Sequence, residues 1–237
     1  MELLLFLLII LLGIFSSWHD IKKGTIPNKL VFCFLMVGIF VFDFSWIGVG
    51  NVLLSLVLSF SFWKLRWWYG GDAKLFVVYS FFLSSLKHAP LQILVNTFLP
   101  LCFYFVLCQA RHISRKDFFA SALGIFSISW LSSFVTQEHL LQMALSYSIL
   151  PLFAQLPGSI FVQSSIAIAR LFFDFSLFTK LFFVSFFSWT FFLIGMRQIV
   201  QQKQYTEHMP FAPALFAGAL ATLLLKESFL DFVISFI

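Results

Sequence analysis

The chain has 237 residues, of which 61% are hydrophobic and only 11% are charged. Soluble domains carry roughly 25% charged residues, so the composition excludes a water-facing globular enzyme or binding module. The formal charge of +5 suggests nucleic-acid binding at first sight, but most lysines and arginines fall in four short loops between apolar runs. This is the positive-inside bias of membrane proteins, and it indicates a lipid-bilayer partner with anionic headgroups and no nucleic acid.

Apolar runs of about twenty residues recur along the chain, separated by short polar breaks, as in helical membrane proteins. The runs do not alternate polar and apolar residues, which excludes strands of an outer-membrane barrel. We therefore predict an all-α fold, a multi-pass transmembrane helical bundle of about eight spans, with ten also possible. Lys22 and Lys23 follow the first run, so the N-terminus is predicted to lie outside.

Five spans are expected before residue 110. The first has no basic residues ahead of it and no small-residue cleavage site after it, so we predict a membrane span and not a cleaved signal peptide. A turn is expected over residues 21–29, and a second one near Asp43. The predicted spans are Leu3–Trp18, Leu30–Phe42, Ile47–Trp63, Ala73–Leu86 and Leu91–Cys108.

Beyond residue 110 the chain is harder to divide. Residues 118–196 are almost wholly apolar, and two or four crossings both fit between basic loops on the same side. An inner polar loop starts at residue 197, and a last apolar segment begins at Pro210-Phe211-Ala212-Pro213. We interpret 1–237 as one membrane-embedded domain with a motif-bearing part in 1–110, a divergent middle in 118–196 and a terminal part in 197–237.

Two further residue types have a simple interpretation. Trp63, Trp67, Trp68 and Tyr69 follow the third span and are predicted to form an aromatic belt at the membrane interface. The three cysteines lie inside apolar runs and form no CxxC, so we predict small buried side chains with no metal site and no disulfide. They are Cys33, Cys102 and Cys108.

Two short polar stretches between apolar runs, residues 20–28 and 69–74, are the candidates for catalytic chemistry. Taken alone, Asp20 is interpreted as a solvated interfacial acid and Asp72 as a helix N-cap. The predicted orientation, however, brings both to the same membrane face. Two carboxylates within a few Å share a proton and together activate water, one as base and the other as acid. Gly70-Gly71 permits close backbone approach, and Lys74 would bias the ionisation of the pair.

The remaining acids have simpler interpretations. Asp174 lies four residues after Arg170, which is the spacing of a helical ion pair. Glu207 and His208 are expected to be solvated in the inner loop. The other acids are predicted to serve as turn, cap or pairing residues, namely Asp43, Asp117 and Asp231.

Three motifs together resemble the type IV prepilin peptidases and archaeal preflagellin peptidases, which are GxGD membrane aspartic proteases. Asp20 is followed after five residues by Ile26-Pro27-Asn28. Gly70-Gly71-Asp72-Ala73-Lys74 follows, and Pro210-Phe211-Ala212-Pro213 lies near the end. The resemblance covers about 1–110 and the last 30 residues. Tyr69 stands where the GxGD pattern has its first glycine.

The resemblance implies that Asp20 and Asp72 are catalytic and that the other motif residues shape the site. These are Ile26, Pro27, Asn28, Gly70, Gly71, Lys74, Pro210, Phe211 and Pro213. It further implies a cell-membrane endopeptidase that removes a short basic leader from prepilin-like or preflagellin-like substrates at the cytoplasmic face, without a cofactor or metal. The chain lacks the paired CxxC motifs of the longer bacterial members, which implies cleavage without the methyltransferase activity.

Two other classes of function stay open at this point. One is the presenilin and signal-peptide-peptidase branch, since Pro213-Ala214-Leu215 spells its Pro-Ala-Leu motif, although His19-Asp20 replaces the expected Tyr-Asp. The other is a transporter or a non-enzymatic scaffold with paired acids. Against a transporter, the two acids are predicted at one face and not at the midplane.

Overall fold

The computed structural model describes residues 2–40, 42, 44–64, 68–109, 123–124, 126–128, 130–135, 141, 158–173 and 210–226. These residues form helices and connecting turns, with no strand among them, as the all-α prediction requires. The chain divides into two compact units. The first combines Met1–Phe98 with Val200–Phe232, and the second combines Leu99–Ile199 with Val233–Ile237.

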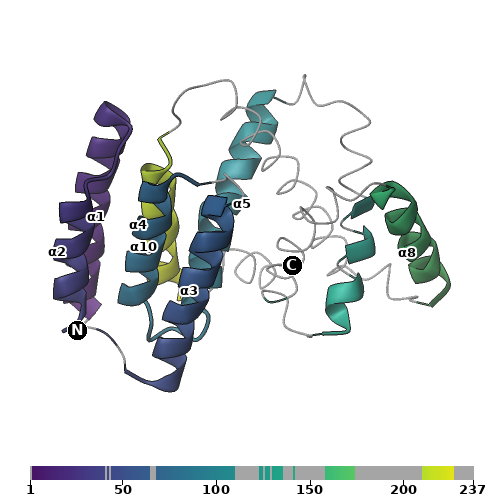
Figure 1. Cartoon of the computed structure of the whole chain (residues 1–237), viewed down its shortest axis with the longest axis horizontal. Coiled ribbons are helices and arrows are strands. Elements are labelled where there is room, and N and C mark those ends of the chain that lie inside the picture. The colour runs from purple at the N-terminus through teal and green to yellow at the C-terminus, as the bar shows by residue number, and fades with distance from the viewer. Residues whose placement is uncertain are drawn as a thin grey trace. The chain divides into compact units, whose positions relative to one another are not determined.

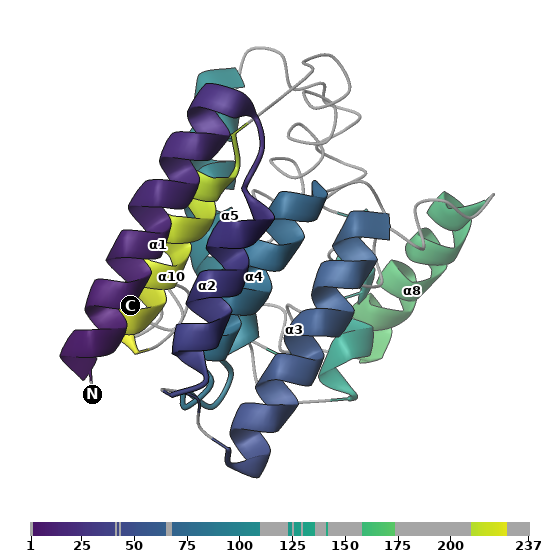
Figure 2. The same cartoon turned by 60° about the vertical axis from the view of Figure 1, so that its left-hand side comes forward.

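The first unit is a bundle in which the helix from the end of the chain lies beside the helix from its beginning (Figures 1 and 2). Its last helix, α10, contacts both α1 and α4. The helices are α1 (Glu2–Lys23), α2 (Asn28–Gly38), α3 (Trp46–Lys64), α4 (Gly70–Phe82), the first half of α5 (Ala89–Gln109) and α10 (Ala212–Leu225).

Helix α1 is longer than the sequence predicted. We expected the span to end at Trp18 and a loop to start at residue 21, but the helix continues to Lys23. It ends where Gly24 takes a positive φ of 64° and its N–H donates to the carbonyl of Asp20 at 2.9 Å. Polar residues after the apolar run continue the helix because nothing breaks it before this glycine. Asp20 consequently lies in a helix and not in a turn.

Helix α4 is the centre of the first unit. It contacts α1, α2, α3 and α10, and its buried residues cover most of its circumference. Gly70, Lys74, Val77 and Phe81 form one stripe that is exposed or half-buried. Leu75, Phe76, Val78 and Tyr79 are each fully buried. Burial over most of the helix surface fits a helix that lies between four others.

Helix α3 holds α4 through a stripe of small and polar residues. Gly48, Asn51, Ser55 and Ser59 are buried at spacings of three or four residues. The Ser59 hydroxyl donates to the carbonyl of Ala73 at 3.1 Å, in the first turn of α4. Beyond the other end of α4, the Asn51 amide donates to the carbonyls of Ser84 (3.0 Å) and Leu86 (2.6 Å). Such contacts join helices in a membrane, where apolar burial adds little.

Small residues also allow α10 to approach its neighbours. A Cβ built on Gly13 of α1 would collide with the ring of Phe216. A Cβ on Gly218 of α10 would lie 2.8 Å from the Cα of Thr97 and would overlap its hydroxyl. Close to this contact, the Asn96 amide donates to the Thr222 hydroxyl at 2.9 Å. The two glycines and this buried hydrogen bond thus help to position α10.

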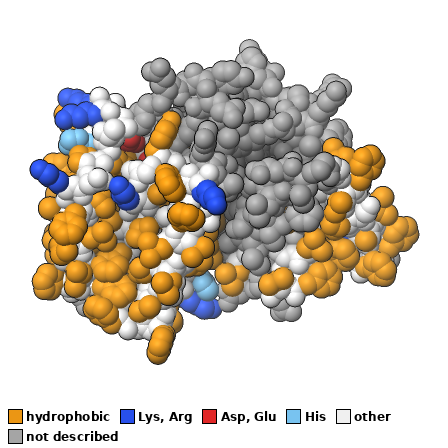
Figure 3. All heavy atoms as spheres, viewed as in Figure 1, with side chains coloured by type: hydrophobic (Ala, Val, Ile, Leu, Met, Phe, Trp, Pro, Cys, Tyr) orange, Lys and Arg blue, Asp and Glu red, His pale blue; other side chains and the backbone are white. Residues whose placement is uncertain are grey.

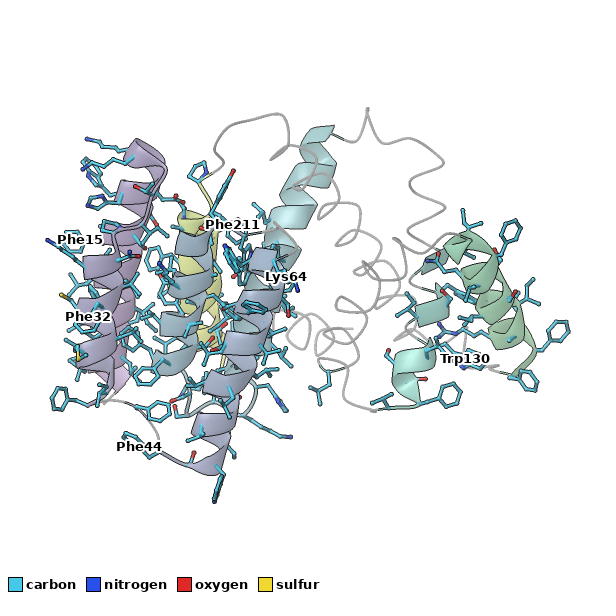
Figure 4. The ribbon with its side chains drawn as sticks, in the orientation of Figure 1. Phe15, Phe32, Phe44, Lys64, Trp130 and Phe211 are labelled. Carbon is cyan, nitrogen blue, oxygen red and sulfur yellow. The ribbon has the colours of Figure 1, made fainter. Side chains whose placement is uncertain are left out.

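Apolar side chains cover the outside of the first unit, as Figure 3 shows. Phe15, Phe32 and Phe44 point outward (Figure 4) and are 51%, 58% and 74% exposed. Two helices of the described chain are long and apolar enough to cross a membrane, Leu3–Lys23 and Trp46–Lys64. Three further apolar helical segments are shorter. The predicted total of eight or ten spans stays a prediction.

Two predictions about single residue types were wrong. Trp68, expected in an interfacial belt, is only 3% exposed and packs inside an aromatic cluster. Its backbone N–H bonds back to the carbonyl of Phe62 at 3.3 Å, which turns the chain inward after α3. Cys33, expected to be buried, is exposed because it lies on the outer side of α2. Trp63 and Tyr69 are exposed as predicted, and Trp67 lies outside the described residues.

The second unit contains α8 (Ser159–Phe173) and short helical stretches between residues 123 and 135. Arg170 is 6% exposed, and its guanidinium donates to the carbonyl of Phe126 at 2.6 Å. The same group lies 4.7 Å from the centre of the Phe126 ring. The predicted partner Asp174 lies outside the described residues, so the ion pair stays a prediction.

The glycine contact in α10 gives a test of the fold. Gly218→Ala should lower the free energy of unfolding by about 1–3 kcal/mol, because the new methyl group meets the Thr97 backbone. Gly50→Ala is the matched control, since nothing lies within 4 Å of its added Cβ, and it should not destabilise. Thermal unfolding of both variants in the same detergent measures this. Equal destabilisation of the two would contradict the packing of α10 against Thr97.

Candidate functional site

Asp20 lies on the buried stripe of α1. Leu12, Ser16 and Asp20 follow one another at a spacing of four residues and are all buried, with Asp20 only 3% exposed. The backbone N–H of Ala212 donates to Asp20 Oδ2 at 2.9 Å. Ala212 is the first residue of α10, where helix N–H groups have no partner within the helix and carry partial positive charge. The start of α10 therefore supplies a hydrogen-bond donor to this carboxylate.

Asp72 lies at the start of α4 and is 2% exposed. The sequence alone suggested that it is the N-cap, but Tyr69 occupies that position and Asp72 is the third residue of the helix. The Tyr69 backbone N–H donates to Asp72 Oδ2 at 3.2 Å. A carboxylate at this position closes the first turn by bonding back to the N-cap amide. Like Asp20, Asp72 is thus buried and held by a backbone N–H at a helix start.

Tyr69 replaces the first glycine of the GxGD pattern without backbone strain. Its φ of −76° and ψ of 161° are ordinary extended values that any residue adopts. Tyr69 is 42% exposed. The local structure requires only an N–H here, and Tyr69 supplies it to Asp72.

The two glycines beside Asp72 differ in what they contact. A Cβ added to Gly71 would lie 3.2–3.3 Å from side-chain atoms of Ile26. A Cβ added to Gly70 would have no atom closer than the Trp63 indole nitrogen at 4.0 Å. Ile26 is itself buried, so Gly71 lets the turn before α2 lie directly on the first turn of α4. This contact joins the first motif to the second.

A second link between these motifs lies at the surface. The Lys74 ammonium donates to the Asn28 amide oxygen at 2.7 Å. Pro27 is the N-cap of α2, with φ −65° and ψ 130°, and Asn28 is its first residue. The sequence suggested that Lys74 biases the ionisation of the aspartates. The structure shows a polar tie from α4 to the start of α2, and the electrostatic role stays a prediction.

The third motif, residues 210–213, is anchored beside the aspartates by an aromatic cluster. Phe211 is 1% exposed and its ring lies 6.2 Å from Trp68 and 5.3 Å from Phe98, centre to centre. Figure 4 shows Phe211 at the start of α10, directed into the first unit. The cluster consists of Phe62, Trp68, Phe76, Phe98 and Phe211. It fixes the segment that places the Ala212 N–H on Asp20. Pro210 is exposed just before it, and Pro213 lies in the first turn of α10.

Sequence reasoning missed the residues that act through backbone groups or through packing. The amides of Ala212 and Tyr69, and the hydroxyl of Ser59, have no signature of their own in the sequence. Trp68 was noted in the sequence, but it was predicted to lie at the membrane interface and is buried. One signal was present, since Asp20 continues the i, i+4 stripe of Leu12 and Ser16 onto the buried face.

The structure joins the three motifs at one end of the first unit, where α1 ends and α2, α4 and α10 begin. Within the described parts of the chain, no group of three His, Cys, Asp or Glu side chains is placed to hold a metal ion. The other acids considered from the sequence, and His208, lie outside those parts. They are Asp43, Asp117, Asp174, Glu207 and Asp231.

Comparisons with known proteins agree with the motifs. Residues 5–110 match the type IV leader peptidase family. The chain is similar to "Prepilin peptidase EppA" of Methanothermobacter thermautotrophicus, with 26% identity over an alignment of 147 residues. The alignment covers 47% of this chain and 38% of the relative. The matched part is thus well under half of that protein. No solved structure matches.

The bond between Asp20 and Ala212 gives a test that needs no activity. Asp20→Ala should unfold more easily than Asp20→Asn, by about 1–3 kcal/mol, because alanine leaves the buried Ala212 N–H without an acceptor. Both changes remove the charge, so their difference reports the lost hydrogen bond together with the space that alanine leaves empty. Equal unfolding temperatures for the two variants would contradict this contact.

Proposed function

We propose that the chain is a member of the type IV leader peptidase family, whose model matches residues 5–110, and that it is a membrane aspartic endopeptidase acting on prepilin-like or preflagellin-like proteins. In this proposal Asp20 and Asp72 form the catalytic pair. The observation that carries it is the shared setting of these two acids. Each is almost wholly buried, each is held by a backbone N–H, and each lies where the three motifs meet.

The chemistry follows from two carboxyl groups that share one proton. The ionised member removes a proton from water, and the water oxygen bonds to the scissile carbonyl carbon. The protonated member donates its proton to the carbonyl oxygen. When the tetrahedral intermediate collapses, the C–N bond breaks and the departing amine takes up a proton from one member of the pair. One hydroxyl of the intermediate returns its proton to the other member as the carbonyl re-forms. The backbone N–H groups of Ala212 and Tyr69 fix the carboxylates for these steps.

We further propose that the site lies at the cytoplasmic face of the cell membrane, with the N-terminus outside. Lys22 and Lys23 end α1, and Lys29 and Lys74 lie at the starts of α2 and α4, beside the aspartates. The Lys22 ammonium also lies 3.8 Å from the centre of the Trp18 ring. Lysines next to tryptophan are typical of the inner membrane interface. A short leader ahead of an apolar substrate helix would reach the pair at this level.

The central test is cleavage of a leader-bearing prepilin-like or preflagellin-like protein expressed together with the enzyme. Asp20→Asn and Asp72→Asn should each reduce cleavage by about 10²–10⁴-fold or more, because either change removes a proton-transfer group. Leader removal is read from the mass shift of the substrate.

Two matched controls accompany these variants. Asp43→Asn and Asp174→Asn remove carboxylates that are predicted to lie away from the inner face, and both should cleave normally. Full activity of either dyad variant, inserted at the wild-type level, would disprove the proposed catalytic pair.

The glycine pair offers a second test of site geometry. Gly71→Ala should slow cleavage by about three- to tenfold, because the methyl group displaces Ile26 by a few tenths of an ångström and small misplacements at a catalytic site are costly. Gly70→Ala adds the same methyl group into open space and should stay within about twofold of wild type. Initial rates of leader removal distinguish the two. A reversed order would argue against the Ile26 contact.

A further inference from the structure

Tyr79 carries a hydroxyl group at a buried position of α4, whereas the neighbouring buried aromatic residues of this helix are phenylalanines. The sequence has 36 phenylalanines and 5 tyrosines, and the buried aromatic neighbours of Tyr79 along α4 are Phe76 and Phe82. Tyr79 is 0% exposed, and its hydroxyl has no hydrogen-bond partner among the described residues. Phenylalanine would fill the same space without burying a polar group. Packing alone therefore does not explain this tyrosine.

The hydroxyl lies close enough to Ser16 of α1 to interact with it, but the two groups do not have the geometry of a hydrogen bond. This contact connects Tyr79 to the candidate site. Ser16 is 0% exposed and donates its own proton to the carbonyl of Gly13 at 3.2 Å. Ser16 is one helical turn before Asp20, about 6 Å along α1. The two hydroxyl groups thus meet on the buried stripe that carries Asp20.

Tyr79 is related to Asp72 in a similar way. It lies seven residues further along α4, about two turns, and so on the same side of the helix. A long side chain in a helix leans toward the helix N-terminus, which in α4 is the end that carries Asp72. Since α1 ends at the site and α4 begins there, Ser16 and Tyr79 both lie further from these helix ends than the aspartates do.

We propose that Tyr79 and Ser16 hold a buried water molecule beneath the two aspartates, and that Tyr79 is a positioning residue for the proposed hydrolysis. Buried polar groups without a protein partner are commonly satisfied by ordered water. The Ser16 oxygen keeps acceptor capacity after its donation to Gly13. A water on these hydroxyls would donate to a carboxylate and fix its orientation. The kinetic part of this inference rests on the proposed function, whereas the water site itself does not.

The kinetic test compares Tyr79→Phe with Ser80→Ala. Ser80 is the matched control because its hydroxyl is also fully buried and has no partner among the described residues. Tyr79→Phe should lower kcat by about tenfold, the effect of one ordinary hydrogen bond, with KM within about twofold. Ser80→Ala should leave both unchanged. Unchanged kcat in Tyr79→Phe, or an equal loss in Ser80→Ala, would overturn the positioning role.

A second measurement needs no substrate. Thermal unfolding of Tyr79→Phe, Asp20→Asn and the double variant should give shifts that differ from additivity by about 2–4 °C, because the water couples the two side chains. Ser80→Ala with Asp20→Asn should be additive. Additive shifts for the Tyr79 pair would overturn the water site whether or not the protein cleaves leaders. Absence of cleavage by the wild type would count against the proposed function alone.

Discussion

The hydrogen bond from Ala212 to Asp20 links two residues that are 192 positions apart. Burying a carboxylate without a partner is strongly unfavourable, so the fold that buries Asp20 must also bring a donor to it. The donor comes from the start of α10, where the first N–H groups of a helix lack internal partners. The buried carboxylate thereby gains a donor, and the Ala212 N–H gains an acceptor. The fold places α10 beside α1 with its N-terminus at the aspartate, and the contact of Gly13 with Phe216 continues the same alignment further along the two helices.

Other helices of the first unit are joined by hydrogen bonds from polar residues on otherwise apolar surfaces. If the outer surface faces lipid, apolar side chains gain little by leaving lipid for protein, so close backbone approach and hydrogen bonds decide which helices pair. Ser59 and Asn51 join α3 to the two ends of the α4 region. Asn96 and Thr222 join α5 to α10. Phenylalanine serves both settings, since Phe15 and Phe32 cover the outside whereas Phe98 and Phe211 pack ring against ring inside.

The site itself is assembled from helix ends. Helix ends supply unpaired backbone N–H groups, and glycine or proline at these ends lets the chain turn closely around them. This explains how the chain tolerates Tyr69 in place of a glycine, because an extended N-cap needs only its N–H. It also explains the different settings of Gly70 and Gly71, of which only Gly71 lies against Ile26. Motif residues thus differ in what they do, although they are adjacent in sequence.

The helical class, the apolar exterior and the pairing of Asp20 with Asp72 as candidates were predictable from the sequence. These follow from composition, from the length of apolar runs and from short motifs, all of which are local properties. The sequence also placed α3 and the start of α10 to within a residue or two. It placed the end of α1 too early, because polar residues do not end a helix and the break comes only at Gly24.

The surroundings of these residues depend on how the helices pack and were not predictable from the sequence. Trp68 looks interfacial beside its exposed neighbours, yet three helices and the Phe211 segment enclose it. The donor for Asp20 is a backbone amide, which every residue but proline carries, so no sequence pattern singles out Ala212. The tie between Lys74 and Asn28 spans 46 positions and depends on α2 lying against α4. Contacts of this kind depend on how the helices pack, and packing is a property of the whole bundle and not of any one segment.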